Sequence, residues 1–110
     1  MSETITFKEW LCNVVEVKYP NGRTALLLQE ATTGAPVAKA SVNLVDVPDE
    51  SMEVMASRLD VATEDLVFIK DYAESEGMLD ALVEQGIVTP TTFKFFNGYI
   101  DIPMCVIRRS

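Results

Sequence analysis

The chain has 110 residues, 48% of them hydrophobic, and carries a formal net charge of -8 at pH 7. This length and apolar content predict one domain with one core, spanning residues 1–110. With no histidine and two cysteines, the chain lacks the ligands for a structural zinc site and cannot form a Ser-His or Cys-His nucleophile. The N-terminus has no signal-peptide pattern, and no apolar run reaches the ~20 residues that span a bilayer, so we expect a cytoplasmic protein without a membrane partner.

The acidic charge is concentrated in the middle of the chain. Residues 46–84 hold twelve acids and two bases, a sum of -10, whereas residues 1–45 hold four of each and residues 85–110 sum to +2. An acidic surface disfavours direct binding to nucleic acid or to an anionic membrane. We therefore expect the partner to be a basic surface on another protein.

Residues 5–45 have the pattern of a three-stranded antiparallel meander. Apolar and polar residues alternate in the first strand, residues 11–19, and turns rich in proline, asparagine and glycine separate the strands. The second strand, residues 23–31, contains an unbroken apolar run, so we expect it to lie centrally and to pack on both faces. The third strand, residues 38–44, alternates regularly and predicts one buried face.

Two helices are predicted after the meander. Asp49 or Ser51 can cap a short helix over residues 51–59, whose apolar residues fall three and four apart. A buried strand follows at residues 66–69. The main amphipathic helix is predicted at residues 74–85, because one apolar stripe runs along it and a glycine follows as its stop.

Two further strands form a hairpin near the C-terminus. Residues 91–96 and 99–107 alternate on either side of Asn97 and Gly98, which is a strong hairpin signal. Pro103 cannot donate a hydrogen bond to a strand ladder, so it predicts a sheet edge or a bulge.

These elements predict an α+β fold. We expect an antiparallel sheet of about five or six strands, with the 74–85 helix packed on one face and the 51–59 helix nearby. No repeat or linker divides the chain.

Cys12 and Cys105 lie in opposite terminal strands among apolar neighbours. That setting is typical of reduced core cysteines in a cytosolic protein. A disulfide between them is the alternative, because terminal strands often pair and the sequence does not fix the distance between the two residues.

The run VFIKDYAESEGML at residues 67–79 precedes a helix that ends in glycine, and GYIDIPMC follows at residues 98–105. Together with the TTGAP turn and the VNLVD end of the meander, these motifs resemble an uncharacterised family of small acidic proteins carried by phages, plasmids and other mobile elements of Gram-positive bacteria. The resemblance covers most of the chain. It departs from the family's pattern between Pro48 and Glu64, where the family is shorter and less clearly helical.

The resemblance implies a setting and brings no activity, cofactor or catalytic residue with it. Small accessory proteins of mobile elements are frequently inhibitors or modulators of host defence. An acidic protein of this kind could occupy a nucleic-acid-binding surface of a host protein.

Acids spaced four apart form one row in the 74–85 helix, and no lysine or arginine lies within the helix to relieve them. Like charges at this spacing destabilise a helix by ~0.2 to 0.5 kcal/mol per pair. We hypothesise that the row, extended by acids before the helix, contacts a basic groove on a partner; a solvated polar face is the more common explanation of such a pattern. The predicted partner-binding residues are Glu76, Asp80, Glu84, Asp60, Glu64 and Asp65.

Asp71, Glu74 and Glu76 could be paired carboxylates for acid-base work or ligands for a hard cation. Their spacing does not match a calcium loop, and Asp71 and Glu74 have the spacing of a helix capping box. We therefore predict helix caps here, with no metal and no cofactor.

Lys70 and Tyr72 flank Asp71 at the turn from strand to helix. A small ligand-binding module or enzyme with its site at this turn is the alternative function. The structural interpretation is that Lys70 pairs with an acidic neighbour and that Tyr72 covers the edge of the core.

Four aromatic residues could form an exposed patch for protein recognition. They are Trp10, Phe93, Phe95 and Phe96. Core positions are more common for such residues, and we expect them for Phe93 and Phe95, which lie two apart on one strand face.

The leading function hypothesis is a non-enzymatic interaction protein of a mobile element, in its sharpest form an anti-defence inhibitor that mimics nucleic acid. A homodimer, or a homo-oligomeric structural accessory protein joined through an edge strand near Pro103, is a further alternative.

Overall fold

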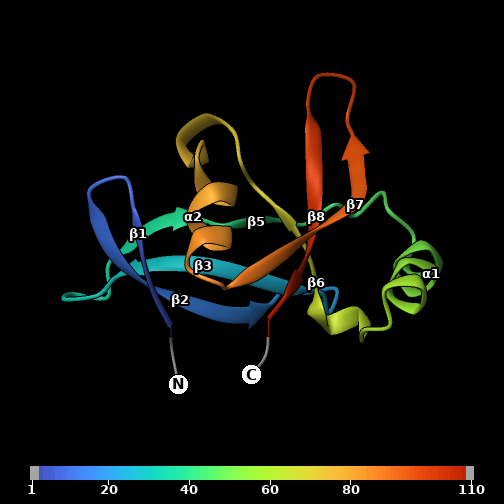
Figure 1. Cartoon of the computed structure of the whole chain (residues 1–110), viewed down its shortest axis with the longest axis horizontal. Coiled ribbons are helices and arrows are strands. Elements are labelled where there is room, and N and C mark those ends of the chain that lie inside the picture. The colour runs from blue at the N-terminus through green and yellow to red at the C-terminus, as the bar shows by residue number, and fades with distance from the viewer. Residues whose placement is uncertain (1–2, 109–110) are drawn as a thin grey trace.

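The computed structural model describes residues 3–108 and, within them, every side chain apart from those of Glu3 and Glu74. The described chain is α+β, with two four-stranded antiparallel sheets and two α-helices (Figure 1). Sheet A has the strand order β1 (Glu3–Phe7), β2 (Trp10–Lys18), β3 (Thr24–Glu30) and β4 (Pro36–Lys39). Sheet B has the order β5 (Ser41–Val42), β6 (Leu66–Ile69), β8 (Asp101–Ile107) and β7 (Val88–Phe96). The helices are α1 (Asp49–Leu59) and α2 (Met78–Glu84), with 3-10 turns η1 (Thr63–Asp65) and η2 (Ala73–Ser75).

The two sheets are joined at Ala40, the single residue between β4 and β5, which is fully buried. Its N–H donates to the Leu26 carbonyl of sheet A at 3.0 Å, and its carbonyl accepts from the Lys70 N–H just after β6 at 3.0 Å. The Ser41 hydroxyl then accepts the Leu26 N–H at 2.9 Å. One extended segment therefore passes from the edge of one sheet to the edge of the other and keeps its backbone hydrogen-bonded to both.

Helix α2 fills the space between the two free edges, because it contacts both β1 and β7. Met78 and Leu82 are fully buried on its inner side. They share a core cluster with Ile5 and Phe7 of β1 and with Val88 of β7. The interior is thus bounded by sheet A, sheet B and one short helix.

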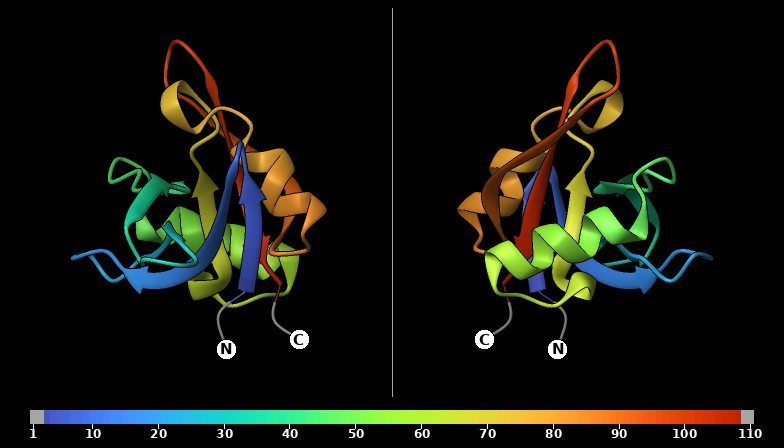
Figure 2. Two further views of the ribbon diagram at one scale, coloured as in Figure 1. Left: turned by 90° about the vertical axis from the view of Figure 1, so that its left-hand side faces the viewer. Right: turned by 90° about the vertical axis from the view of Figure 1, so that its right-hand side faces the viewer.

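Helix α1 covers the opposite face of sheet B, and the right-hand view of Figure 2 shows it lying across β6 and β8. Met52 and Ala56 of α1 form a second core cluster with Leu66, Phe68 and Met104 of the sheet. The intervening strand residues point the other way, into the interior, as the alternation of strands requires. The central strands β6 and β8 are therefore buried on both faces over most of their length, and the predicted buried strand at residues 66–69 is confirmed.

The strand arrangement differs from the expectation of one sheet with about five or six strands. Strand β1 was not predicted, because the turn after it contains neither glycine nor proline; Lys8 takes the left-handed conformation instead, with φ 55°. Strand β8, which carries Pro103, lies between β6 and β7, so of the two alternatives predicted at this proline the sheet edge is wrong for the strand as a whole, whereas the bulge agrees with a register irregularity in the paired strand β7. The pairing of β6 with β8 ends at Met104, so Pro103 pairs only with β7, where its partner is Lys94. Strand β7 has a register shift between Pro90 and Lys94.

The helix bounds also differ. Helix α2 covers residues 78–84 rather than 74–85, and α1, at residues 49–59, is the longer of the two described helices. The predicted hairpin is confirmed, with the Asn97 side-chain oxygen accepting the N–H groups of Tyr99 and Ile100 at 3.0 Å each. None of the described helices is long and apolar enough to cross a membrane.

Candidate functional site

The turn that begins α2 is organised by Asp71. Its Oδ1 accepts the backbone N–H groups of Gly77 and Leu79, each at 3.0 Å. These donors lie at the start of the helix, where the first N–H groups have no partner within the helix. The predicted capping role of Asp71 is confirmed. Asp71 lies before η2, six residues ahead of Gly77, so its carboxylate reaches the helix across η2.

Two further polar residues of this turn, Glu74 and Ser75, differ from Asp71. The side chain of Glu74 lies outside the described part of the structure. Ser75 is fully buried, and its hydroxyl donates to the Lys39 carbonyl at 2.9 Å, which ties η2 to the end of β4. Ser75 is therefore not a helix cap but a link between the turn and sheet A.

The predicted row of three acids is broken. Glu76 lies before α2, and Gly77 separates it from the helix with a left-handed φ of 92°. Glycine adopts this conformation without the steric cost that other residues meet, which explains why the helix begins only at Met78. Asp80 and Glu84 remain on one face of α2, one turn apart and both exposed.

The remaining predicted partner-binding residues lie at the end of α1 and in η1, which contacts α1, and Figure 1 shows α1 away from α2. Asp60 ends α1 in a left-handed conformation with φ 56° and is exposed. Glu64 and Asp65 lie in η1; Glu64 is exposed and Asp65 is half-buried. The six predicted residues therefore form two separate groups, and these three do not extend the acids of α2.

Helix α1 itself carries acids that the sequence hypothesis did not include. Asp49 and Glu50 in its first turn and Glu53 in its second are exposed. We call the exposed acids of this region the α1 acidic surface. It consists of Asp49, Glu50, Glu53, Asp60 and Glu64.

A cleft of about 450 Å³ separates α1 from the turn between β2 and β3. It is lined on one side by acids of the α1 acidic surface and on the other by Lys18 and Arg23. Lys18 Nζ donates to the Thr24 hydroxyl at 2.8 Å, and that hydroxyl donates to the Glu64 carbonyl at 2.6 Å. Lys18 therefore binds Thr24 on its own side of the cleft, and the Thr24 hydroxyl makes the hydrogen bond that joins the two walls.

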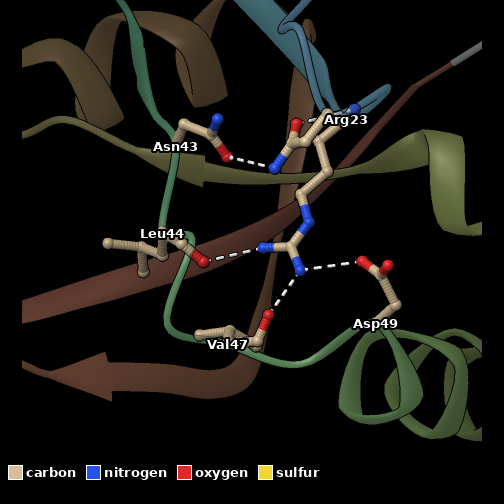
Figure 3. A network of polar contacts seen from close by, with 6 residues as sticks. Arg23, Asn43, Leu44, Val47 and Asp49 are labelled. Atoms are coloured by element: carbon tan, nitrogen blue, oxygen red, sulfur yellow. Dashed lines mark hydrogen bonds and ion pairs between the residues drawn. The ribbon is translucent and has the colours of Figure 1, made fainter.

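Arg23 is the centre of this connection, and Figure 3 shows its contacts. Its guanidinium donates to the Leu44 carbonyl at 2.7 Å, to the Val47 carbonyl and to the Asp49 carboxylate at 2.9 Å. The Arg23 side chain is only 14% exposed, whereas that of Asp49 is 87% exposed. Arg23 therefore fixes the segment leading into α1 by binding backbone carbonyls, and it offsets only one of the helix's acids.

Sequence reasoning missed Arg23 because its partners lie 21 to 26 residues away. The only sequence signal was an arginine directly after a turn, which has no specific meaning. Arginine is suited to this role because its planar group presents several donors at once.

The Lys70–Tyr72 turn has local explanations for its side chains. Lys70 Nζ lies over the Tyr72 ring, 5.7 Å from its centroid, and Tyr72 packs against the core cluster beneath α1. The predicted place of Tyr72 at the edge of the core is confirmed. Cys105 is close enough to Asp71 to be influenced by it; burial first, and then this carboxylate, raise the pKa of the thiol to about 12. A protonated thiol is a poor nucleophile.

Both cysteines are free and buried, as expected for reduced core residues. The pKa of Cys12 is also raised, by burial and then by the charge of Glu30. Within residues 3–108, no group of three or more acids or cysteines is placed to hold a metal ion.

The four aromatic residues divide between core and surface. Phe93 and Phe95 pack against the core cluster beneath α1, as predicted. Trp10 is 44% exposed and Phe96 is 63% exposed, near the tip of the β7–β8 hairpin. These residues lie on different sheets and do not form one patch.

Comparisons of the chain with protein-family models, with curated proteins and with solved structures found no match.

Proposed function

We propose that the protein is a non-enzymatic interaction protein whose acidic surface binds a basic surface on another protein. One observation carries the proposal: most acids of residues 46–84 are exposed, and few bases lie among them. Arg58 and Lys70 are the two bases of that segment. The exposed acids are Asp46, Asp49, Glu50, Glu53, Asp60, Glu64, Glu76, Asp80 and Glu84.

The α1 acidic surface is the stronger contact candidate of the two groups. Acids in the first turn of a helix stabilise it through the helix dipole, which gives Asp49 and Glu50 a structural reason to be acidic. Glu53 and Glu64 have no such reason and line the same cleft. The pair Asp80 and Glu84 on α2 forms a smaller, separate site.

The resemblance to proteins of mobile elements supports a host protein as the partner, in the cytoplasm of the host cell. An acidic protein that blocks a nucleic-acid-binding groove has to present several carboxylates to the cations that would otherwise contact phosphates. An anti-defence inhibitor acting as a nucleic-acid mimic is the sharpest form of the proposal.

The proposal is tested by affinity capture from a Gram-positive host lysate over a series of salt concentrations. We expect a captured protein whose binding weakens as salt rises, because screening reduces attraction between exposed charges. The double variant Glu53→Lys, Glu64→Lys should reduce capture at least tenfold. Asp80→Lys, Glu84→Lys should have a smaller effect.

A matched control changes the net charge by the same amount elsewhere. Glu9→Lys combined with Thr32→Lys and Thr92→Lys alters three exposed positions outside residues 46–84. This variant should still capture the partner. Equal losses in both variants would show that net charge alone matters, and unchanged capture by the Glu53 and Glu64 variant would contradict the proposed site.

A further inference from the structure

The outer face of sheet A is almost uncharged and carries an apolar stripe on its two central strands, with Thr4 and Thr6 of β1 and Gln29 of β3 as polar neighbours. On β2, it presents Leu11, Asn13, Val15 and Val17. On β3, Leu27 pairs directly with Val15 on one side and with Lys39 of β4 on the other, so all three share this face. Lys39, the single charged residue among these, lies on β4, an edge strand of the sheet.

No described helix covers this face, although Ala25, which pairs with Val17 on it, is buried. The helices pack elsewhere: α2 in the interior and α1 on sheet B. Leu11 is 56% exposed and Val17 is 39% exposed, while Val15 and Leu27 are half-buried by their neighbours within the sheet. Antiparallel sheets with one solvated face normally alternate between apolar and polar residues, and β2 departs from that rule.

We propose that two copies of the chain associate through the outer faces of their A sheets. Such an interface is two-fold symmetric, with the same residues contributed by each copy. Two sheets packed face to face at a small angle would interdigitate Leu11, Val15, Val17 and Leu27 from both copies. Leu27, the half-buried residue in the apolar run of β3, would then be buried like its neighbours Ala25, Leu26 and Leu28.

The distribution of charge favours a second copy as the occupant. Two chains of net charge -8 repel each other, and the repulsion is weakest where their acids are farthest apart. Residues 1–45, which contain sheet A, sum to zero, and the -10 of residues 46–84 belongs to the segment that carries α1, β6 and α2. A basic partner protein would have nothing to attract it to the neutral face.

The size of the face indicates a weak dimer. The strands of sheet A have 5, 9, 7 and 4 residues, which at about 3.3 Å per residue and about 4.8 Å between strands gives on the order of 400 Å² per copy. The two copies together would bury about 800 Å², which is below the size of stable specific interfaces and corresponds to a weak, transient contact. We therefore expect dissociation at micromolar rather than nanomolar concentrations.

Sedimentation velocity of the full chain between about 1 µM and 1 mM tests the proposal. The average mass should rise from one chain toward two as concentration increases. Higher salt should strengthen this association, since it screens the repulsion between acidic copies. Binding of a basic partner responds to salt in the opposite direction, so the two interactions are distinguishable.

Leu11→Lys combined with Val17→Lys should remain monomeric over the whole range, whereas Val45→Lys, at a more exposed apolar residue outside the face, should still dimerise. In case the lysines disturb the sheet, Asn13→Cys provides a second measurement: mild oxidation should cross-link two copies through residue 13 and should not do so for Val45→Cys. A wild-type chain that stays monomeric at 1 mM, or a dimer that survives the two lysines, would overturn the proposal. Cross-linking through residue 45 but not residue 13 would do so as well.

Discussion

Sheet A and sheet B are both antiparallel and both have four strands, but their surroundings differ. Sheet B lies between two helices, with α2 on its inner face and α1 on its outer face. Sheet A shares the interior and leaves its outer face open to solvent. Burial on both faces is therefore a property of the central strands of sheet B and not of the whole fold.

The charge of the chain follows the same division. The neutral segment, residues 1–45, contains sheet A, and the acidic segment, residues 46–84, supplies the helices around sheet B. The difference indicates two surfaces suited to different contacts: an acidic surface for a basic partner and a neutral apolar face for another copy of the chain.

Among the substitutions considered, the largest loss in the free energy of unfolding is expected at Phe68 of sheet B. It is 5% exposed on the outer face of sheet B, beneath α1. Phe68→Ala removes a large side chain from a close-packed site and should lower the free energy of unfolding by about 3–5 kcal/mol. Urea titration followed by circular dichroism measures this change.

Phe96→Ala is the matched control, because the same side chain is 63% exposed on the same sheet. Its cost should stay within about 0.5 kcal/mol. Equal costs at the two positions would mean that α1 does not cover sheet B in solution.

Arg23 connects the two regions, since it extends from sheet A to the carbonyls that precede α1. Arg23→Ala should lower the free energy of unfolding by about 1–3 kcal/mol, because it leaves the Leu44 and Val47 carbonyls without their hydrogen-bond donor. Asp49→Asn removes only the exposed ion pair and should cost below about 1 kcal/mol. Unfolding by urea compares the two variants, and a larger loss in Asp49→Asn would show that the ion pair is the important contact.

The sequence predicted the parts of this fold whose signals are local. The buried strand at residues 66–69 and the turn at Asn97 depend on neighbouring residues, and both were predicted correctly. The division into two sheets depends on Ala40, which has no distinctive sequence signal: its role comes from hydrogen bonds to Leu26 and Lys70, far away in the chain.

The candidate site was predictable in charge but not in geometry. The sum of -10 in residues 46–84 is a property of the sequence. The continuous row through Glu76 failed because a helical pattern does not reveal where a glycine takes a left-handed conformation, as Gly77 does. The α1 acidic surface was missed because its cleft is closed by residues 18–23, which precede it by more than 25 positions.

The raised pKa of the buried Cys105 thiol makes the stability of the fold depend on pH. The folded pKa of Cys105 is about 12, above its ordinary value of 9.0. As pH rises, the unfolded chain loses this proton first, so the stabilisation is complete below about pH 9 and declines toward pH 12. Between pH 8 and pH 10, the wild type should lose about 1.4 kcal/mol more stability than Cys105→Ala.

Urea titrations at several pH values measure this difference, and the groups common to both chains cancel in the comparison. Parallel stability curves for the wild type and Cys105→Ala would contradict the expected protonated thiol. Cys12→Ala, a substitution of the same kind in sheet A, should leave the contribution of Cys105 in place.

The smallest effect is expected on the open face of sheet A. Leu11→Thr and Val17→Thr keep residues that favour strands and remove apolar surface that is already in contact with water. At low micromolar concentration, each should change the free energy of unfolding by less than about 0.5 kcal/mol. At near-millimolar concentration, the wild type should gain stability from self-association, because binding to the folded state alone shifts the unfolding equilibrium. The threonine variants should lack that gain. A cost that is the same at both concentrations would assign these residues to the core of the single chain, and the contrast between the two sheets would then disappear.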